Sequence, residues 1–389
     1  MQKKQKKLII HRAKQPPKRR TAPAFTPTTS WFVLKRWVQT SLWRVGAVAV
    51  ALMLFLSVTF MYVFSQYYIA KHADEPFKLG TTFVPDYARY FELDPEETLE
   101  AMFKDLGVKN IRFVSYWKNH EPERGVYNFD ELDWQFKLAE KYGANVSLSI
   151  GLRQPRWPEC HMPQWAEGLS KETWSQELKT YMGAVINRYQ DSPALESYQL
   201  ENEFFLDVFG ICPDFSRERL VDEYNFVKAK DPHHPIIVSM SNNAIGTPLY
   251  EPTPDMWGVA VYKRVWDQNI TKRYFEYPLP AWYYAFRAGW TEATRGRPVF
   301  IHELQTEPWM PMGFDLKTSS LEEQDKSMNA DMLKHRIEYG RATGMRKVDL
   351  WGTEWWYWRM VKKGDSSLWD VAKAEFSQAN AGTGRYKVR

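Results

Sequence analysis

Cysteine is scarce in this sequence, and its scarcity excludes several classes of protein. Two cysteines in 389 residues are too few for a disulfide-stapled small domain or for the common four-ligand zinc modules. The eight histidines show no HExxH or His-x-His spacing, and no phosphate-binding or dinucleotide-binding glycine motif occurs. We therefore expect neither a catalytic metal ion nor a bound cofactor.

Acidic residues are missing from the first 44 positions, which contain 12 of the 52 Lys and Arg. The remaining residues, 45–389, therefore hold 40 basic and 47 acidic groups, a net charge of −7, although the whole chain has a net charge of +5. Prolines are scattered through residues 1–44 and no apolar period is sustained, so the sequence predicts a disordered basic tail. A topology signal that also contacts anionic lipid explains these charges better than a nucleic-acid partner, which we do not expect.

Formal charge is also missing from residues 45–70, between Arg44 and Lys71. About 20 apolar residues span a bilayer, so this segment is long enough. A cleaved signal peptide would have a shorter apolar region and a small-residue cleavage site, whereas bulky residues such as Tyr67 end this one. A buried core helix is the other alternative. We predict a single transmembrane helix over 45–70, with the N-terminus in the cytoplasm and the following domain outside the cell.

From about residue 78, short apolar runs alternate with longer amphipathic stretches, which is typical of βα units around a parallel sheet. Eight strands are predicted, at residues 79–84, 110–115, 145–151, 197–201, 235–240, 256–262, 298–303 and 347–351. Helices are expected between them, for example at residues 95–106, 171–188, 217–230 and 321–343. A doubly wound sheet would have fewer strands and a glycine-rich first turn, which is missing here. The pattern predicts an α/β fold, a (β/α)8 TIM barrel over residues 71–376, followed by a flexible tail over 377–389.

The active site of such a barrel lies at the carboxyl ends of its strands. Glu203 follows the fourth predicted strand and Glu303 ends the seventh. Carboxylates in these places are costly unless they are hydrogen-bonded or functional. Two carboxyl groups facing each other across a pocket are what glycoside cleavage requires, one as the acid and the other as a nucleophile or base. Each glutamate alone could be an unrelated surface residue, and Glu201 is a rival for the role of the acid.

The sequence around these glutamates resembles clan A of the retaining glycoside hydrolases, which includes the family 5 and family 42 enzymes. The resemblance rests on the Asn202-Glu203 pair, on Glu303 within HELQTEPW (302–309), and on WKNHEPERGVYNFDELD (117–133). It covers about residues 78–370. It implies an O-glycosyl hydrolase that cleaves β-linked oligosaccharides or polysaccharides by double displacement.

The resemblance also implies a role for each matching residue. Glu303 would be the nucleophile and Glu203 the general acid/base. The remaining matches would bind the sugar or hold the nucleophile: Asn202 at the sugar 2-hydroxyl, Arg112 and Tyr262 at Glu303, and Trp351 or Trp355 beneath the reacting sugar. Many clan members carry a histidine at the end of the third strand, whereas His161 lies ten residues beyond that strand and receives no role.

Tryptophan is abundant, with 18 in the chain. Indole rings stack on the apolar faces of sugars, so we expect loop tryptophans such as Trp157 to bind substrate, although aromatic residues also fill ordinary cores. Cys160 lies in the loop after the third strand and Cys212 in the loop after the fourth. Adjacent strands make adjacent loops, so we expect a disulfide between these cysteines in an outward-facing domain, with two free thiols as the alternative.

Together these features predict a membrane-anchored, cellulase-like retaining glycoside hydrolase whose partner is a carbohydrate. A transglycosylase would use the same two glutamates, and a non-catalytic carbohydrate-binding or cell-surface structural barrel is the alternative from another class. The sequence leaves the sugar and its linkage open, because clan A includes glucan, mannan, xylan and galactoside enzymes.

Overall fold

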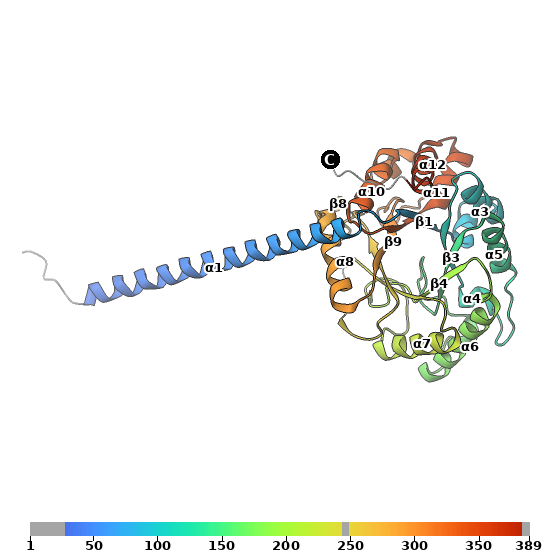
Figure 1. The fold of residues 1–389 in the computed structure, drawn as a ribbon, viewed down its shortest axis with the longest axis horizontal. Helices are drawn as coiled ribbons and strands as arrows, with labels where there is room; N and C mark the ends of the chain where they lie inside the picture. The colour runs from blue at the N-terminus through green and yellow to red at the C-terminus, as the bar shows by residue number, and fades with distance from the viewer. Residues whose placement is uncertain (1–27, 243–248, 383–389) are drawn as a thin grey trace, which may run out of the picture. The chain divides into compact units, whose positions relative to one another are not determined.

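Eight parallel strands close into a barrel in the computed structural model, which describes residues 28–242 and 249–382 (Figure 1). Around the barrel the strands follow the order β1-β10-β9-β6-β5-β4-β3-β2. Each predicted strand overlaps one of them, so the predicted TIM barrel is confirmed. Their bounds are β1 (Lys78–Thr82), β2 (Asn110–Val114), β3 (Asn145–Ile150), β4 (Leu195–Leu200), β5 (Ile236–Met240), β6 (Met256–Val261), β9 (Val299–Gln305) and β10 (Lys347–Trp351).

Helices surround the strands and bury their apolar faces against them (Figure 1). Local signals set several helix ends: the Asp94 side chain accepts the Glu97 N–H before α3, and Gly143 ends α5 in the left-handed region. The helices of the barrel are α2 (Pro85–Tyr90), α3 (Pro95–Lys104), α4 (Trp117–His120), α5 (Asp130–Tyr142), α6 (Lys171–Tyr189), α7 (Arg217–Lys230), α8 (Ala281–Arg295), α9 (Leu321–Asp325), α10 (Ala330–Ala342), α11 (Thr353–Lys363) and α12 (Ser367–Asn380).

The structure differs from the sequence predictions in three places. The helix expected over residues 321–343 is two helices, α9 and α10, because Asn329 is extended and its side chain caps the Met332 N–H. An antiparallel hairpin of β7 (Arg264–Trp266) and β8 (Tyr274–Glu276) follows β6. Strands of three residues are too short to give a periodic signal. Helix α12 ends at Asn380, within four residues of the predicted tail boundary.

The first helix, α1 (Thr28–Lys71), contains the whole predicted membrane span. Its segment Leu42–Lys71 is long and apolar enough to cross a membrane. The helix starts inside the segment predicted as a disordered tail, so residue 44 does not mark a break in the secondary structure. Residues 1–27 of that tail and 383–389 at the other end lie outside the described residues. Residues 1–59 and 60–389 form two compact units.

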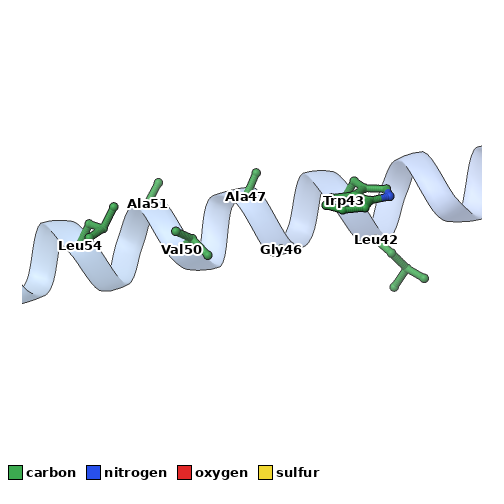
Figure 2. Close-up of a pocket in the computed structure, with 7 residues that line it drawn as sticks. All are labelled: Leu42, Trp43, Gly46, Ala47, Val50, Ala51 and Leu54. Atoms are coloured by element: carbon green, nitrogen blue, oxygen red, sulfur yellow. The ribbon is translucent and has the colours of Figure 1, made fainter.

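A shallow apolar hollow lies along the part of α1 before residue 59 (Figure 2). It exists because Gly46, Ala47 and Ala51 have little or no side chain. None of its lining residues is titratable, so the hollow offers no side chain that could act as an acid, a base or a nucleophile. The lining residues are Leu42, Trp43, Gly46, Ala47, Val50, Ala51 and Leu54.

The last turns of α1 belong to the second unit and pack against α8. The Phe64 ring lies 6.0 Å from the Phe286 ring and 6.2 Å from the Trp290 ring. Gly289 permits the close approach, since a Cβ atom there would lie 3.1 Å from Phe64 Cε1. Lys71 then pairs with Glu292. The helix end is therefore an integral part of the folded barrel domain.

The barrel interior has no room for a side chain at position 80. A Cβ atom at Gly80 would lie 2.9 Å from the Asn110 carbonyl oxygen and would collide with Asp349 Oδ1. Gly80→Ala should therefore lower the free energy of unfolding by about 1–3 kcal/mol, the range for overpacking, as measured by denaturant unfolding. The matched change Gly183→Ala in α6, whose nearest neighbour is the flexible Phe226 side chain, should leave stability unchanged or higher. Equal losses in both variants would contradict this account of the interior.

Candidate active site

Glu203 and Glu303 reach the barrel mouth from different strands. Glu203 follows β4, whereas Glu303 lies inside β9, two residues before the strand ends. The pairing of β9 with β6 shifts between Ile301 and Glu303, so His302 is an extra residue, as in a β-bulge. Bulges re-aim side chains next to active sites. All seven residues of β9 are buried, His302 and Glu303 among them, because helices cover the outer face of the barrel.

Both carboxylate oxygens of Glu303 are held by residues that the sequence singled out. Arg112 Nη2 donates to Glu303 Oε1 at 2.8 Å, and the Tyr262 hydroxyl donates to Glu303 Oε2 at 2.8 Å. Burial, followed by the charge of Glu303, raises the pKa of Tyr262 well above its ordinary value. The phenol therefore stays protonated and remains a donor. The arrangement fixes the orientation of the carboxylate.

Arg112 is completely buried and fully partnered. Besides Glu303, it donates from Nε to Thr82 Oγ1 and from Nη1 to Gln199 Oε1, both at 2.9 Å. Its guanidinium lies 5.4 Å from the ring centroid of Trp351. Since a buried charge is tolerated only with such partners, β1, β4, β9 and β10 all contribute to keeping this cation beside Glu303.

Glu203 has the opposite environment. Its Oε1 atom is buried and has no hydrogen-bond partner among the described residues. Burial, followed by the negative charges of Glu303 and Glu159, raises the pKa of Glu203 well above its ordinary value. Its backbone is held by the Ser239 hydroxyl, which accepts the Glu203 N–H at 2.9 Å. The raised pKa favours the protonated form of Glu203, whose Oε1 atom remains free for a ligand.

Asn202 lies in a chain of hydrogen bonds that starts at the nucleophile candidate. Gln199, already bonded to Arg112, donates from Nε2 to Asn202 Oδ1 at 2.9 Å. Asn202 Nδ2 then donates to Glu159 Oε2 at 3.2 Å. These contacts fix the orientation of the amide and leave one of its N–H groups for a ligand.

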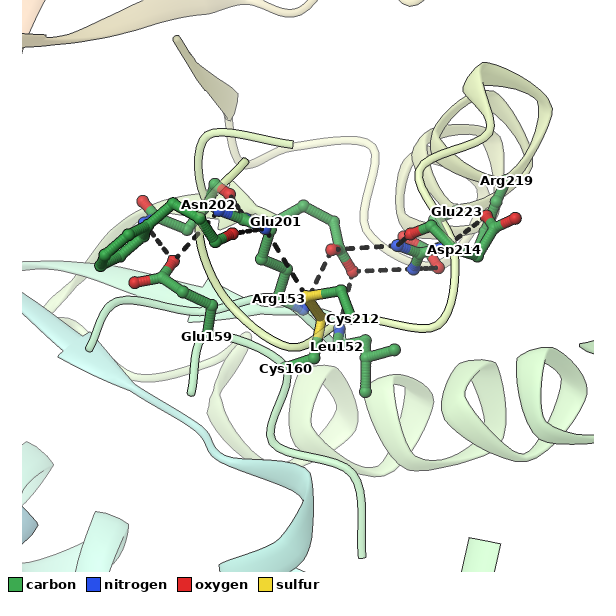
Figure 3. The surroundings of a disulfide bond; sticks show 11 residues. Leu152, Arg153, Glu159, Cys160, Glu201, Asn202, Cys212, Asp214, Arg219 and Glu223 are labelled. Atoms are coloured by element: carbon green, nitrogen blue, oxygen red, sulfur yellow. Dashed lines mark hydrogen bonds and ion pairs between the residues drawn. A yellow bond between two sulfur atoms is a disulfide. The ribbon is translucent and has the colours of Figure 1, made fainter. Parts of the chain in front are cut away.

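Glu159 is a third carboxyl group of the site, which the sequence analysis missed. It lies in the loop after β3, is only 4% exposed, and has Arg153 Nη2 at 3.7 Å (Figure 3). Burial raises the pKa of Glu159 to about 8, although the charge of Arg153 opposes the shift. Loop residues follow no period, so its burial could not be read from the pattern. The sequence offers one indication that Glu159 belongs to the site, because this residue directly precedes Cys160.

The rival acid Glu201 is committed to structure. It accepts the main-chain N–H groups of Leu152 and Arg153 at 2.6 and 3.0 Å, and it pairs with Arg219 at 3.1 Å (Figure 3). Arg219 in turn binds Glu223 at 2.6 Å. A carboxylate with these partners ties the loops after β3 and β4 together and is not available as a catalytic acid.

The two cysteines join the same loops. Cys160 and Cys212 form a disulfide with a Cα–Cα distance of 5.2 Å (Figure 3). Arg153 reinforces this connection, because its Nε donates to the Asn202 carbonyl at 2.7 Å and its Nη1 donates to the Phe209 carbonyl at 3.0 Å. The loop that begins with Glu203 is therefore cross-linked to its neighbour by covalent and polar contacts.

The three tryptophans predicted to bind substrate have different surroundings. Trp157 is exposed on the loop after β3, and Trp351 is buried at the end of β10. The expectation for Trp355 is corrected: it is fully buried within α11, where its indole N–H donates to Gln324. Of the two candidates for the floor under the sugar, only Trp351 borders the site.

One face of Trp351 is covered by a charged pair that the sequence did not reveal. The Arg156 guanidinium lies 4.0 Å from the ring centroid of Trp351 and 3.4 Å from that of Tyr87. Glu307 binds Arg156 through both oxygens, at 2.6 and 3.0 Å. A sugar ring stacked on this face would have to displace the guanidinium.

Backbone strain is concentrated at this site. Four of the six non-glycine residues with positive φ in the described part of the chain lie in the loops after β3 and β4. Such conformations are costly and gather at functional sites. These residues are Arg156 (φ 82°), Glu159 (73°), Glu201 (56°) and Glu203 (41°). Within residues 28–242 and 249–382, no cluster of three or more His, Cys, Asp or Glu side chains could hold a metal ion.

Sequence comparison finds partial matches to β-galactosidases and mannosidases. No protein-family model matches the chain. In sequence it is similar to Beta-galactosidase 11 of Oryza sativa subsp. japonica, with 26% identity over 30% of this chain and 16% of the relative. Mannan endo-1,4-beta-mannosidase F of Aspergillus fumigatus is 26% identical over 34% of this chain and 33% of the relative. The chain thus matches a third or less of the length of these relatives.

Solved structures show the same fold. The structure of a GH5_18 protein from Bifidobacterium longum subsp. longum superposes with a TM-score of 0.55 at 11% identity, covering 79% of this chain and 80% of the other. The beta-galactosidase from Halorubrum lacusprofundi superposes with a TM-score of 0.50 at 15% identity, covering 77% and 58%. This chain resembles the glycoside hydrolases of families 5 and 42. The resemblance deduced from the sequence motifs is confirmed.

The raised pKa of Glu159 has a consequence for stability. Because the native carboxyl binds its proton up to about pH 8, the folded state holds more protons than the unfolded state between about pH 4.5 and 8, and stability falls as pH rises through this window. Glu159→Gln, which cannot ionise, should be more stable than the wild type at pH 8.5, by at most about 5 kcal/mol, and equally stable at pH 4. Thermal unfolding at both pH values checks this. The exposed Glu167→Gln should show no pH-dependent difference, and the same flat result for Glu159→Gln would contradict the prediction.

Proposed function

We propose that this protein is a membrane-anchored retaining glycoside hydrolase that cleaves β-linked glycans by double displacement. The observation that carries the proposal is the contrast between the two glutamates. Glu303 has both oxygens engaged by Arg112 and Tyr262, whereas Glu203 is buried, has an unpartnered oxygen and a raised pKa. Two carboxyl groups whose environments push their protonation states apart are the acid and the nucleophile of such a reaction.

In the first step, Glu303 attacks the anomeric carbon and Glu203 gives its proton to the leaving oxygen, which produces a glycosyl-enzyme and a free aglycone. In the second step, Glu203, now ionised, removes a proton from water, which attacks the anomeric carbon and releases Glu303. Asn202, oriented by Gln199 and Glu159, would donate its free N–H to the sugar 2-hydroxyl. The β-galactosidases and mannosidases among the similar proteins support a β-linked hexose as the sugar.

Variants of the two glutamates should separate their roles. Glu303→Gln removes the nucleophile and should abolish turnover of every β-glycoside. Glu203→Gln removes the acid and should lower kcat/KM, which reports the first step, by about 10²–10⁴-fold for substrates with poor leaving groups, but lower it much less for activated aryl glycosides, since their leaving groups need no proton. Initial rates on paired alkyl and aryl glycosides test this. Glu167→Gln is the control, and unchanged turnover by Glu303→Gln would refute the nucleophile assignment.

The membrane part of the proposal rests on α1 and on the charges before it. The segment Leu42–Lys71 has the length and composition of a span, and the 12 basic residues that precede position 45 support a cytoplasmic N-terminus. A disulfide beside the site supports a domain outside the reducing cytoplasm.

Reporter fusions should show this orientation in a bacterial host. Alkaline phosphatase, which is active only outside the cytoplasm, should be active when it is fused after Arg389, whereas a cytoplasmic fluorescent reporter at the same place should be dark. Replacing the basic residues Lys35, Arg36 and Arg44 by Glu should reduce phosphatase activity several-fold. An inactive phosphatase fusion in the unaltered chain would contradict the proposed topology.

A further inference from the structure

An apolar surface leads from the nucleophile candidate to the outside of the barrel. The Tyr262 ring, which bonds Glu303, lies 5.7 Å from the Trp309 ring, and Trp309 lies 6.4 Å from Phe209. Phe209 then lies 5.7 Å from Trp157. We refer to Trp157, Val208, Phe209, Ile211 and Trp309 as the apolar wall.

The outer part of the apolar wall is aliphatic and exposed. Val208 is 85% exposed and Ile211 is 66% exposed, and the Ile211 N–H donates to the Pro158 carbonyl beside Trp157 at 2.9 Å. Exposed apolar groups gathered next to an active site mark a surface that binds an apolar partner. Aliphatic side chains offer hydrocarbon contact without the flat face on which sugars stack.

The ring orientations also argue against a stack of sugars. The planes of successive rings are inclined by 83° between Tyr262 and Trp309, 43° between Trp309 and Phe209, and 69° between Phe209 and Trp157. A sugar-binding platform presents ring faces, whereas two of these three ring pairs pack edge to face and the third is tilted. They form a continuous hydrocarbon surface that suits a flexible chain.

The apolar wall is built into the site, and three of its five residues lie on the loop that carries the proposed acid. One loop, residues 203–216, begins with Glu203 and carries Phe209. Arg153 holds the Phe209 carbonyl at 3.0 Å, and Gly210 packs so closely on Glu159 that a Cβ atom would come within 2.8 Å of Glu159 Cβ. Because the general acid protonates the leaving oxygen, the group that leaves is the one facing this loop.

We propose that the apolar wall binds the hydrocarbon chain of a leaving group, so that the substrate is a glycolipid, a β-glycoside with a long alkyl aglycone. This rests on the proposed glycosidase function and names its substrate class. A chain that carries a candidate membrane span would meet such a substrate in the bilayer.

The test uses the full-length chain in lipid nanodiscs and a series of methyl, butyl and octyl β-glycosides of one sugar, together with the corresponding disaccharide, all below micelle-forming concentrations. We expect kcat/KM to be at least tenfold higher for the octyl than for the methyl glycoside, because each buried methylene strengthens binding. Phe209→Ala and Ile211→Ser should each lower this octyl-to-methyl ratio below threefold. Ile270→Ser, exposed in the β7–β8 turn and outside the apolar wall, should keep the ratio.

A flat chain-length series, a disaccharide preferred to the octyl glycoside, or an unchanged ratio in Phe209→Ala would overturn the inference. If no glycoside in the series is cleaved, the proposed function fails, and binding decides the inference separately. Quenching of tryptophan fluorescence in Glu303→Gln should then show octyl binding at least tenfold tighter than methyl binding, with the difference lost in the Phe209→Ala background. Equal binding of both glycosides would refute it.

Discussion

The site is organised around one buried charge, the guanidinium of Arg112. A cation without solvent inside a barrel must be satisfied by the protein, and Arg112 obtains partners from Thr82, Gln199 and Glu303. Three strands are thereby set at one height around the barrel mouth. The same requirement extends outward, because Gln199, oriented by Arg112, orients Asn202 in its turn. The positions of these side chains thus follow from the need to compensate the buried charge of Arg112.

The remaining charges of the site follow from that arrangement. Burial, followed by the negative charges of Glu303 and Glu159, raises the pKa of Glu203, and burial raises the pKa of Glu159 to about 8. Both shifts favour the protonated carboxyl group. Away from this centre, Arg156 and Glu307 neutralise each other over Trp351. One face of Trp351 therefore carries a polar cover that is separate from the hydrogen bonds around Arg112.

The strands and the residues at their ends could be predicted, whereas the loops could not. Periodicity and apolar runs reveal a strand, and parallel strands bring their ends together, so Glu203 and Glu303 were identified without coordinates. The bulge at His302, the burial of Glu159 and the Arg156–Glu307 pair depend on contacts between distant segments, which leave no periodic trace. For Trp355, by contrast, the sequence suggested a contact that the structure lacks. Its position after a strand predicted contact with a ligand, but it lies in the first turn of α11 with its ring in the core.

Because Cys160 and Cys212 form a disulfide, assembly of the site depends on the redox environment of the chain as well as on its sequence. Thiols kept reduced in a cytoplasm cannot form it, so a newly made chain would lack the covalent clamp on the two loops that carry Glu159 and Glu203. In the proposed topology, the disulfide would form only after the barrel reaches an oxidising environment, where it would join the loops that carry Glu159 and Glu203. Export would then act as a maturation step that completes the proposed site.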